Sequence, residues 1–227
     1  MNKIQSISRS AGITAIVDQM RYDIITRNYG PDEVLTENNL SEKYGVSRGS
    51  IRTALQVLEN DGLIGTMPNG RKFVVSVSDK DIENYYEVRS MLECAAGRII
   101  LGMDYVDYSE LAKAVHEFHV IAEEPDEQVL KARRLETNTR FHRVLVEMSQ
   151  NRALIQCWNT IEPVLITLAK INSSVLDKTS HGHDYVELHT KILEYIIKKD
   201  EALIDYLNNH IMVEAKSATY KGMYKSE

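Results

Sequence analysis

The sequence LTENNLSEKYGVSRGSIRTALQVLENDGLI, residues 35–64, contains two short helical patterns separated by a turn. Thr36 precedes the first pattern, where threonine can cap a helix N-terminus. Gly45 follows the pattern, and glycine readily adopts the left-handed conformation that ends many helices. Ser47 precedes the second pattern, which stops at Asp61-Gly62. Two short helices joined by a turn that contains glycine are typical of a helix-turn-helix. The apolar stripe of the second helix is Ile51, Ala54, Leu55 and Leu58.

The segments on either side complete a small domain. Residues 13–28 carry apolar side chains at helical spacing, which predicts a helix before the helix-turn-helix. Two strand-like runs, 63–66 and 72–77, follow it, and Asn69-Gly70 between them indicates a β-hairpin. Three helices followed by a hairpin are the layout of a winged helix-turn-helix, whose last helix enters the major groove of double-stranded DNA.

The last of these helices presents hydrogen-bond donors on one flank. With Ile51 at the centre of the buried stripe, Arg48 and Arg52 fall on one side of the helix. Arginine suits guanine O6 and N7, and hydroxyl and helix N–H groups suit phosphate oxygens. A solvated arginine face is the alternative interpretation of either arginine alone. The residues predicted to contact DNA are Thr36, Ser47, Arg48, Ser50, Arg52, Asn69, Gly70 and Arg71.

The whole-chain net charge of −6 opposes DNA binding, because a protein surface that binds a duplex must neutralise phosphates. The charge is unevenly distributed, however. Residues 1–78 carry nine Lys or Arg and eight Asp or Glu, whereas residues 79–227 carry eighteen and twenty-five. The acidity therefore belongs to the second part of the chain and leaves the DNA interpretation intact.

The composition excludes several other classes of protein. The chain has 227 residues, of which 43% are hydrophobic and 26% charged, as in ordinary globular proteins. Its apolar runs are far shorter than the roughly 20 residues of a membrane span, and residues 1–11 lack the apolar segment of a secretory signal. We therefore expect a cytoplasmic protein without membrane contact. Cys94 and Cys157 are expected to be buried thiols.

Beyond Asp79 the sequence shows only helical patterns. We expect a mainly α chain with two domains: a winged helix-turn-helix over residues 1–78, and an all-α six-helix bundle over residues 79–227 for effector binding and dimerisation. The six predicted helices span residues 80–102, 107–123, 126–149, 151–171, 183–199 and 201–218.

Three histidines lie on core-facing stripes of these helices. Asn138 and His142 are four residues apart and so share one helix face, and His189 and His210 follow apolar spacing in later helices. A single histidine in such a place is most often a hydrogen-bonded core residue. Three that converge with an amide oxygen favour a site for a divalent transition metal, Zn or Ni, because imidazole suits these ions.

Both parts of the chain resemble one family of bacterial transcription regulators. Tyr44 to Arg48, Ile51 to Leu55 and Asn69 to Val74 resemble the DNA-binding domain of the GntR family, over residues 13–77. Asn138 to His142, with His189 and His210, resembles the FCD ligand-binding domain of the FadR branch, over residues 80–218. The number of predicted helices in this domain, six, is similar to that of the shorter, VanR-like subgroup.

The resemblance implies a ligand set and a partner. Many FCD domains bind a metal through Asp, His, His and His, and here Asn138 takes the first place, a weaker ligand that leaves more positive charge. Effectors of the family are often small carboxylates or sugar acids. Arg89 is predicted either to bind such an acid or to pair with Glu93 at the surface. A homodimer on a palindromic operator is expected.

Two alternatives to an effector-controlled regulator remain open. In the first alternative, the protein is a metal-responsive regulator, and the metal ion itself is the signal. In the second, less favoured, the three histidines and open metal positions form a hydrolase. No general base follows the ligands as in His-Glu-x-x-His, so we expect no enzymatic activity.

Overall fold

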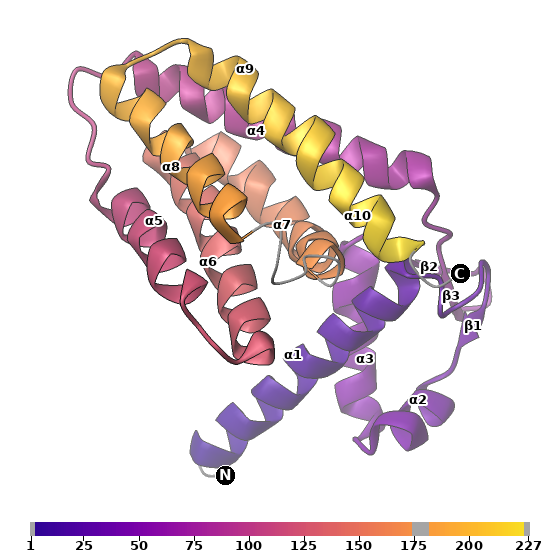
Figure 1. The fold of residues 1–227 in the computed structure, drawn as a ribbon. Coiled ribbons are helices and arrows are strands. Elements are labelled where there is room, and N and C mark those ends of the chain that lie inside the picture. The colour runs from indigo at the N-terminus through magenta and orange to yellow at the C-terminus, as the bar shows by residue number, and fades with distance from the viewer. Residues whose placement is uncertain (1–2, 174–181, 225–227) are drawn as a thin grey trace. The chain divides into compact units, whose positions relative to one another are not determined.

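The computed structural model describes residues 3–173 and 182–224. Its internal contacts divide the chain into an N-terminal unit, Met1–Ile82, and a C-terminal unit, Glu83–Glu227. The division falls in the first turn of helix α4 (Asp79–Leu101). Figure 1 shows the elements of both units.

The N-terminal unit is the predicted winged helix-turn-helix. It adds one strand that the sequence analysis missed, β1, because two residues are too short to give an alternating pattern. β1 pairs antiparallel with β3, and β3 pairs antiparallel with β2, so the sheet order is β1-β3-β2. The elements are α1 (Lys3–Ile25), β1 (Val34–Leu35), α2 (Glu37–Tyr44), α3 (Arg48–Asn60), β2 (Ile64–Thr66) and β3 (Lys72–Val74).

Helix α1 differs from its prediction at both ends. It begins upstream of Gly12, since one glycine in a helical pattern lowers stability without stopping the helix. It ends at Ile25, two residues before Arg27, whose positive φ of 64° turns the chain. Arg21 in α1 donates to Asp61 at 2.8 Å, and this nearly buried ion pair joins α1 to the end of α3.

The predicted capping residues determine where the helices of the helix-turn-helix begin and end. Thr36 Oγ1 accepts from Asn39 N at the start of α2, and Ser47 Oγ accepts from Ser50 N at the start of α3. Gly45 has a φ of 64° and donates its N–H to Ser41 O, which closes α2. Each cap typically contributes about 1 kcal/mol, so three short local signals fix where both helices begin and where the turn lies.

The C-terminal unit is a helical bundle, as predicted. In Figure 1, α5, α6 and α8 lie side by side, and α4 runs along α9 and α10. The last three elements follow one another without a break, so the described residues form the six expected helical segments. They are α4, α5 (Ser109–Ala122), α6 (Glu127–Met148), α7 (Arg152–Ser173), α8 (Gly182–Lys198), and the run of α9 (Ala202–Asn209), η1 (His210–Ala215) and α10 (Lys216–Met223).

The π-helical segment η1 has a cause in the sequence. The inner face of the last helix repeats every four residues, whereas an α-helix turns once every 3.6, so the stripe drifts by about 40° at each step. A wider π-turn offsets this drift and keeps the face turned toward the bundle. The buried residues on that face are Leu203, Leu207, Ile211, Ala215 and Thr219.

Two further expectations from the sequence concern membrane spans and the two cysteines. Among the described residues, no helix is both long enough and apolar enough to cross a membrane. The prediction of two buried thiols is correct for Cys94 and wrong for Cys157, which is exposed. Cys157 directly precedes the buried Trp158 in α7, so the two side chains point to different faces of the helix.

The wing depends on close packing between its strands. A Cβ added to Gly65 in β2 would lie 2.5 Å from Cζ of Phe73 in β3. Gly65→Ala should therefore destabilise the hairpin by about 1–3 kcal/mol, seen as lost hydrogen-exchange protection of the β2 and β3 amides. Gly49→Ala is the control, since its Cβ would meet only Ser47 Oγ at 3.8 Å. Equal protection in both variants would contradict this account of the wing.

Candidate functional site

The exposed flank of α3 carries the two predicted base-reading arginines. Both Arg48 and Arg52 are exposed. Arg52 donates Nε and Nη2 to the two carboxylate oxygens of Glu37 in α2, at 2.8 and 2.9 Å. A bidentate pair of this kind fixes the plane of a guanidinium, so Glu37 holds the Arg52 side chain across the helix-turn-helix.

The hydroxyl groups predicted to meet phosphate are arranged differently from expectation. Ser47 is exposed at the start of α3, and Thr36 is half-buried at the start of α2. Ser50 is 7% exposed, and its Oγ lies 3.0 Å from Ser47 Oγ. Ser50 therefore supports the cap from inside and is removed from the predicted DNA contacts.

The wing tip is exposed. Gly70 has a φ of 81° and donates its N–H to Met67 O, which closes the turn. Asn69 Oδ1 accepts from Arg71 N at 3.1 Å, so the Asn69 side chain stabilises the loop while the Arg71 side chain extends from it. The next residue, Lys72, donates to Glu59 of α3 at 2.6 Å.

The three predicted histidines meet inside the C-terminal unit. His142 in α6, His189 in α8 and His210 at the start of η1 are all at most 5% exposed. One ligand atom of each lies within 4.8 Å of the others. The tertiary structure thus brings together residues that are up to 68 positions apart in sequence.

Each ring is oriented by an oxygen at Nδ1. His142 Nδ1 lies 2.7 Å from Glu93 Oε2, His189 Nδ1 lies 2.7 Å from Tyr185 O, and His210 Nδ1 lies 3.1 Å from Glu214 Oε2. An Nδ1–H that donates to oxygen leaves Nε2 with its lone pair, and this is the tautomer that metal-binding histidines use.

The fourth predicted ligand completes the cluster. Asn138 Oδ1 lies 3.2 Å from His189 Nε2, and Asn138 is 8% exposed. With Nδ1 of His189 donating to Tyr185 O, two electron pairs face each other across this gap. A cation between them would remove the repulsion.

One buried atom tests whether a metal fits these residues. His142 Nε2 is buried and, among the described residues, has no hydrogen-bond partner. A buried polar atom without a partner costs about 1–3 kcal/mol, so its presence calls for a bound group. An unprotonated imidazole nitrogen, two further imidazoles and an amide oxygen suit a divalent transition metal.

Burial keeps two of the imidazoles, those of His142 and His189, uncharged. It lowers the pKa of His142 to about 4, in spite of the neighbouring Glu93 carboxylate. Burial, together with the other two histidines, also places the pKa of His189 well below its usual value. At neutral pH both rings are therefore in the form that binds metal.

Glu93 is the charged centre of this region. Arg89 Nε donates to Glu93 Oε1 at 2.7 Å, while His142 shares Oε2, and Glu93 is fully buried. Burial alone raises the pKa of Glu93, but His142 and Arg89 outweigh it and hold the pKa at about 2. The ion pair predicted for Arg89 and Glu93 exists, but it is buried and not at the surface.

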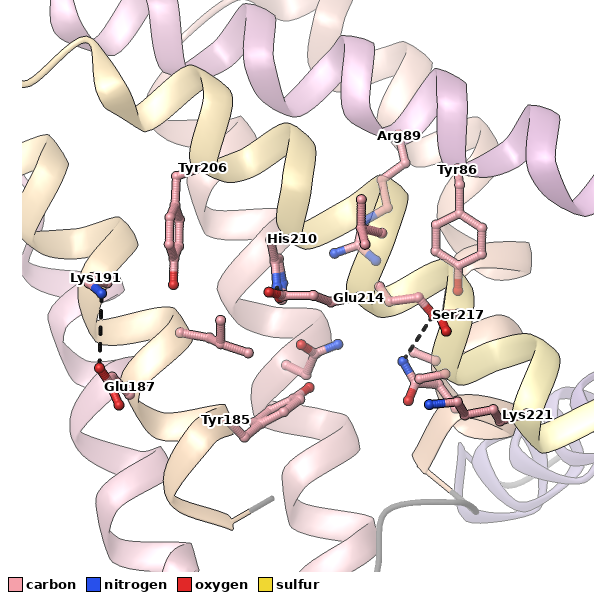
Figure 2. Close-up of a pocket in the computed structure, with 17 residues that line it drawn as sticks. Tyr86, Arg89, Tyr185, Glu187, Lys191, Tyr206, His210, Glu214, Ser217 and Lys221 are labelled. Carbon is pink, nitrogen blue, oxygen red and sulfur yellow. Dashed lines mark hydrogen bonds and ion pairs between the residues drawn. The ribbon is translucent and has the colours of Figure 1, made fainter. Parts of the chain in front are cut away.

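A cavity of about 680 Å³ adjoins the cluster (Figure 2). Arg89, Asn138 and His210 line it, so the predicted effector-binding arginine and two predicted ligands face the same space. The remaining wall is mixed: it has apolar and aromatic residues, such as Tyr185 and Tyr206, and charged residues, Glu187, Lys191, Glu214 and Lys221. A cavity of this size is typical of a small-molecule site, and its polar lining suits a polar ligand.

Several groups that form this site were not predicted from the sequence. The Tyr185 carbonyl and Glu214 each precede or follow a predicted histidine ligand by four residues, so helical spacing alone would have found them. Arg134 precedes Asn138 by the same interval and is 6% exposed. Its burial had no separate signal in the sequence.

The winged unit and the helical unit with its histidine cluster define a class: DNA-binding regulators with a separate ligand-binding domain. Residues 13–74 match the model of the bacterial regulatory proteins of the gntR family, and residues 84–212 match that of the FCD domain. The chain belongs to the GntR family of bacterial regulators, in the branch that carries an FCD domain.

Relatives and a solved structure agree. The chain is 28% identical over 196 residues to YdhC of Bacillus subtilis, an uncharacterized HTH-type transcriptional regulator, with 81% of this chain and 80% of YdhC covered. It is 24% identical over 202 residues to the gluconate operon transcriptional repressor of Bacillus licheniformis, covering 87% and 81%. The Lar protein, which controls the expression of the Listeria monocytogenes agr system, has the same fold, with a TM-score of 0.67, 16% identity and coverage of 92% and 96%.

These families and relatives are transcriptional regulators and not enzymes, in agreement with the expectation from the sequence. The hydrolase alternative therefore has no support.

The burial of Glu93 generates a stability prediction. Glu93→Ala leaves the buried Arg89 charge without its partner and should cost about 3–5 kcal/mol of unfolding free energy. Urea unfolding followed by fluorescence of Trp158, the single tryptophan, measures it in the C-terminal unit. Glu110→Ala, which removes an exposed ion pair with Lys113, should change stability by less than about 0.5 kcal/mol. Similar effects of the two substitutions would refute the central role of Glu93.

Proposed function

We propose that this protein is a cytoplasmic, homodimeric transcription regulator that binds operator DNA through its N-terminal unit and a small organic acid in its C-terminal unit. The observation that carries this proposal is the cavity beside three convergent histidines, in a chain that also has a winged helix-turn-helix. The relative named after the gluconate operon supports a sugar acid or similar carboxylate as the class of effector.

In this proposal the recognition helix reads bases through Arg48 and Arg52. Arg48 extends from the first turn of α3, where helix N–H groups also attract phosphate. In the free protein, Glu37 holds Arg52. When Arg52 binds guanine, its guanidinium either leaves Glu37 or keeps one hydrogen bond to it. Ser47 and the wing residues Asn69, Gly70 and Arg71 contact the backbone or the adjacent groove.

Asn138, His142, His189 and His210 would hold the metal, Zn or Ni by the chemistry of the donors. A divalent ion supplies positive charge that attracts a carboxylate of the effector. Arg89 lies on the cavity wall with its Nε committed to Glu93, and it presents its remaining N–H groups to the same carboxylate. The cavity is far larger than a metal site needs, which favours an organic effector over the metal as the signal.

Two winged units related by a two-fold axis would read both halves of a palindrome. Effector binding then shifts the relative placement of the two readers. Such coupling between sites typically amounts to about 1–3 kcal/mol. Dimerisation is therefore part of the proposed mechanism of control.

The DNA-binding role is tested by two arginine substitutions. Arg48→Ala and Arg52→Ala should each weaken operator binding by about 1–3 kcal/mol, because each removes a contact to a base. An operator selected from random duplexes, followed by affinity measurement at one fixed salt concentration, gives the result. Arg98→Ala, on the exposed face of α4, is the control and should bind as the wild-type protein does. Unchanged affinity in both α3 variants would reject this assignment of the reading helix.

The metal-binding role is tested by ligand substitution. His142→Ala and His189→Ala should each remove bound metal after dialysis against zinc or nickel, measured by elemental analysis. Asn138→Asp should bind more tightly than the wild-type protein in a competition titration, because a carboxylate is the stronger ligand. His119→Ala, an exposed histidine of α5, should change neither result. Metal retained equally by all four variants would exclude these ligands.

A further inference from the structure

Arg134 is a buried cation that has no hydrogen-bond acceptor among the described side chains. It lies in α6, one helical turn before Asn138, and is only 6% exposed. Its guanidinium carbon lies 5.5 Å from the centroid of the Tyr185 ring. Among the described side chains, those of residues 12–173 and 185–224, no hydrogen bond or ion pair to the Arg134 side chain is found.

The buried carboxylates among the described residues already have partners. Glu93 pairs with Arg89, at 2.7 Å. Glu162 accepts from both Nε and Nη2 of Arg143 at 2.6 Å and from Trp158 at 3.1 Å. Neither carboxylate is left to balance the charge of Arg134.

An unpaired buried charge is costly, so folding tolerates it where it serves a ligand. A guanidinium stays ionised even when buried, although burial lowers the pKa of Arg134. The ring of Tyr185 offers only a weak cation–π contact and no hydrogen-bond acceptor. The donors of Arg134 are therefore available to a bound anion.

Arg134 lies beside the cavity that Figure 2 shows. Arg134 lines a small recess whose walls also include Asn138, Ala169, Asn172 and Tyr185. These four residues line the large cavity as well, so the recess adjoins it. The Asn172 Oδ1 atom is buried and, among the described residues, has no hydrogen-bond partner, so it can accept from a hydroxyl group of the ligand but not bind its anionic group.

We infer that the effector carries two anionic groups: a carboxylate that faces Arg89 and the histidine cluster, and a second carboxylate or a phosphate that Arg134 binds in the recess. The inference rests on the proposed effector site and narrows its ligand class to dicarboxylates and phosphorylated acids. The neutral Asn138 amide agrees with it, because an aspartate there would place a negative charge between the two anion-binding positions.

Three sugar acids with the same six-carbon chain separate these cases. Gluconate ends in a hydroxyl group, glucarate in a second carboxylate and 6-phosphogluconate in a phosphate. Binding of each to the zinc-loaded full-length protein is measured by calorimetry. The wild-type protein should bind glucarate or 6-phosphogluconate about tenfold or more tightly than gluconate, because only these offer Arg134 an anionic partner. Which of the two binds more tightly identifies carboxylate or phosphate.

Arg134→Met should abolish this preference and leave gluconate affinity unchanged, and Arg134→Lys should keep part of it. Arg133→Met is the matched control, since Arg133 is the neighbouring, half-exposed arginine of the same helix. It should retain the full preference. Without ligand, Arg134→Met should also unfold at the same or a higher temperature than the wild-type protein, because it removes an unpaired buried charge.

Three results would overturn the inference: wild-type protein that binds neither glucarate nor 6-phosphogluconate at millimolar concentration, a preference that survives in Arg134→Met, or destabilisation of the ligand-free Arg134→Met protein. None of them removes the proposed function, which fails separately if ligands that bind leave operator affinity unchanged. Loss of binding of all three acids in His142→Ala would support the metal part of the proposed function and leave Arg134 to be judged by selectivity alone.

Discussion

The buried carboxylate of Glu93 is the constraint on which the ligand-binding unit depends. Its two oxygens accept from Arg89 in the same helix and from His142 in α6, so one side chain joins α4 to the histidine cluster. A carboxylate without solvent is stable only with such partners. Because Glu93 accepts a hydrogen bond from the Nδ1–H group of His142, the Nε2 lone pair of that ring faces the cluster, and the orientation of the proposed metal ligand follows.

The same arrangement fixes the electrostatics of the cavity. Glu93 neutralises Arg89, and burial keeps His142 and His189 uncharged, so these four groups add little net charge. Arg134 remains as a positive charge, and a bound divalent ion would add more. In an acidic chain, Arg134 and the proposed ion would thus supply the positive charge that the proposed acid effector requires.

Much of the fold could be predicted because its signals are local. Thr36, Gly45 and Ser47 act on neighbouring backbone groups, and their caps appear as expected. The four-residue interval between Asn138 and His142 places both on one face of α6 by helix geometry alone. The strand β1 escaped prediction because two residues form no period, and the π-turn at His210 because it depends on packing of the whole last helix.

The sequence by itself determined the winged helix, the helical bundle and the residue types available for DNA and metal, since these depend on capping, periodicity and side-chain chemistry. Only the tertiary structure decided which side chains are buried and which partners come from another helix. Ser50 turns inward to the Ser47 cap, the Arg89–Glu93 pair is buried, and Arg134 lies in the interior with no acceptor among the described side chains. The physical reason is that burial, and pairing between helices, depend on how separate helices pack together, and no local spacing along the chain encodes them.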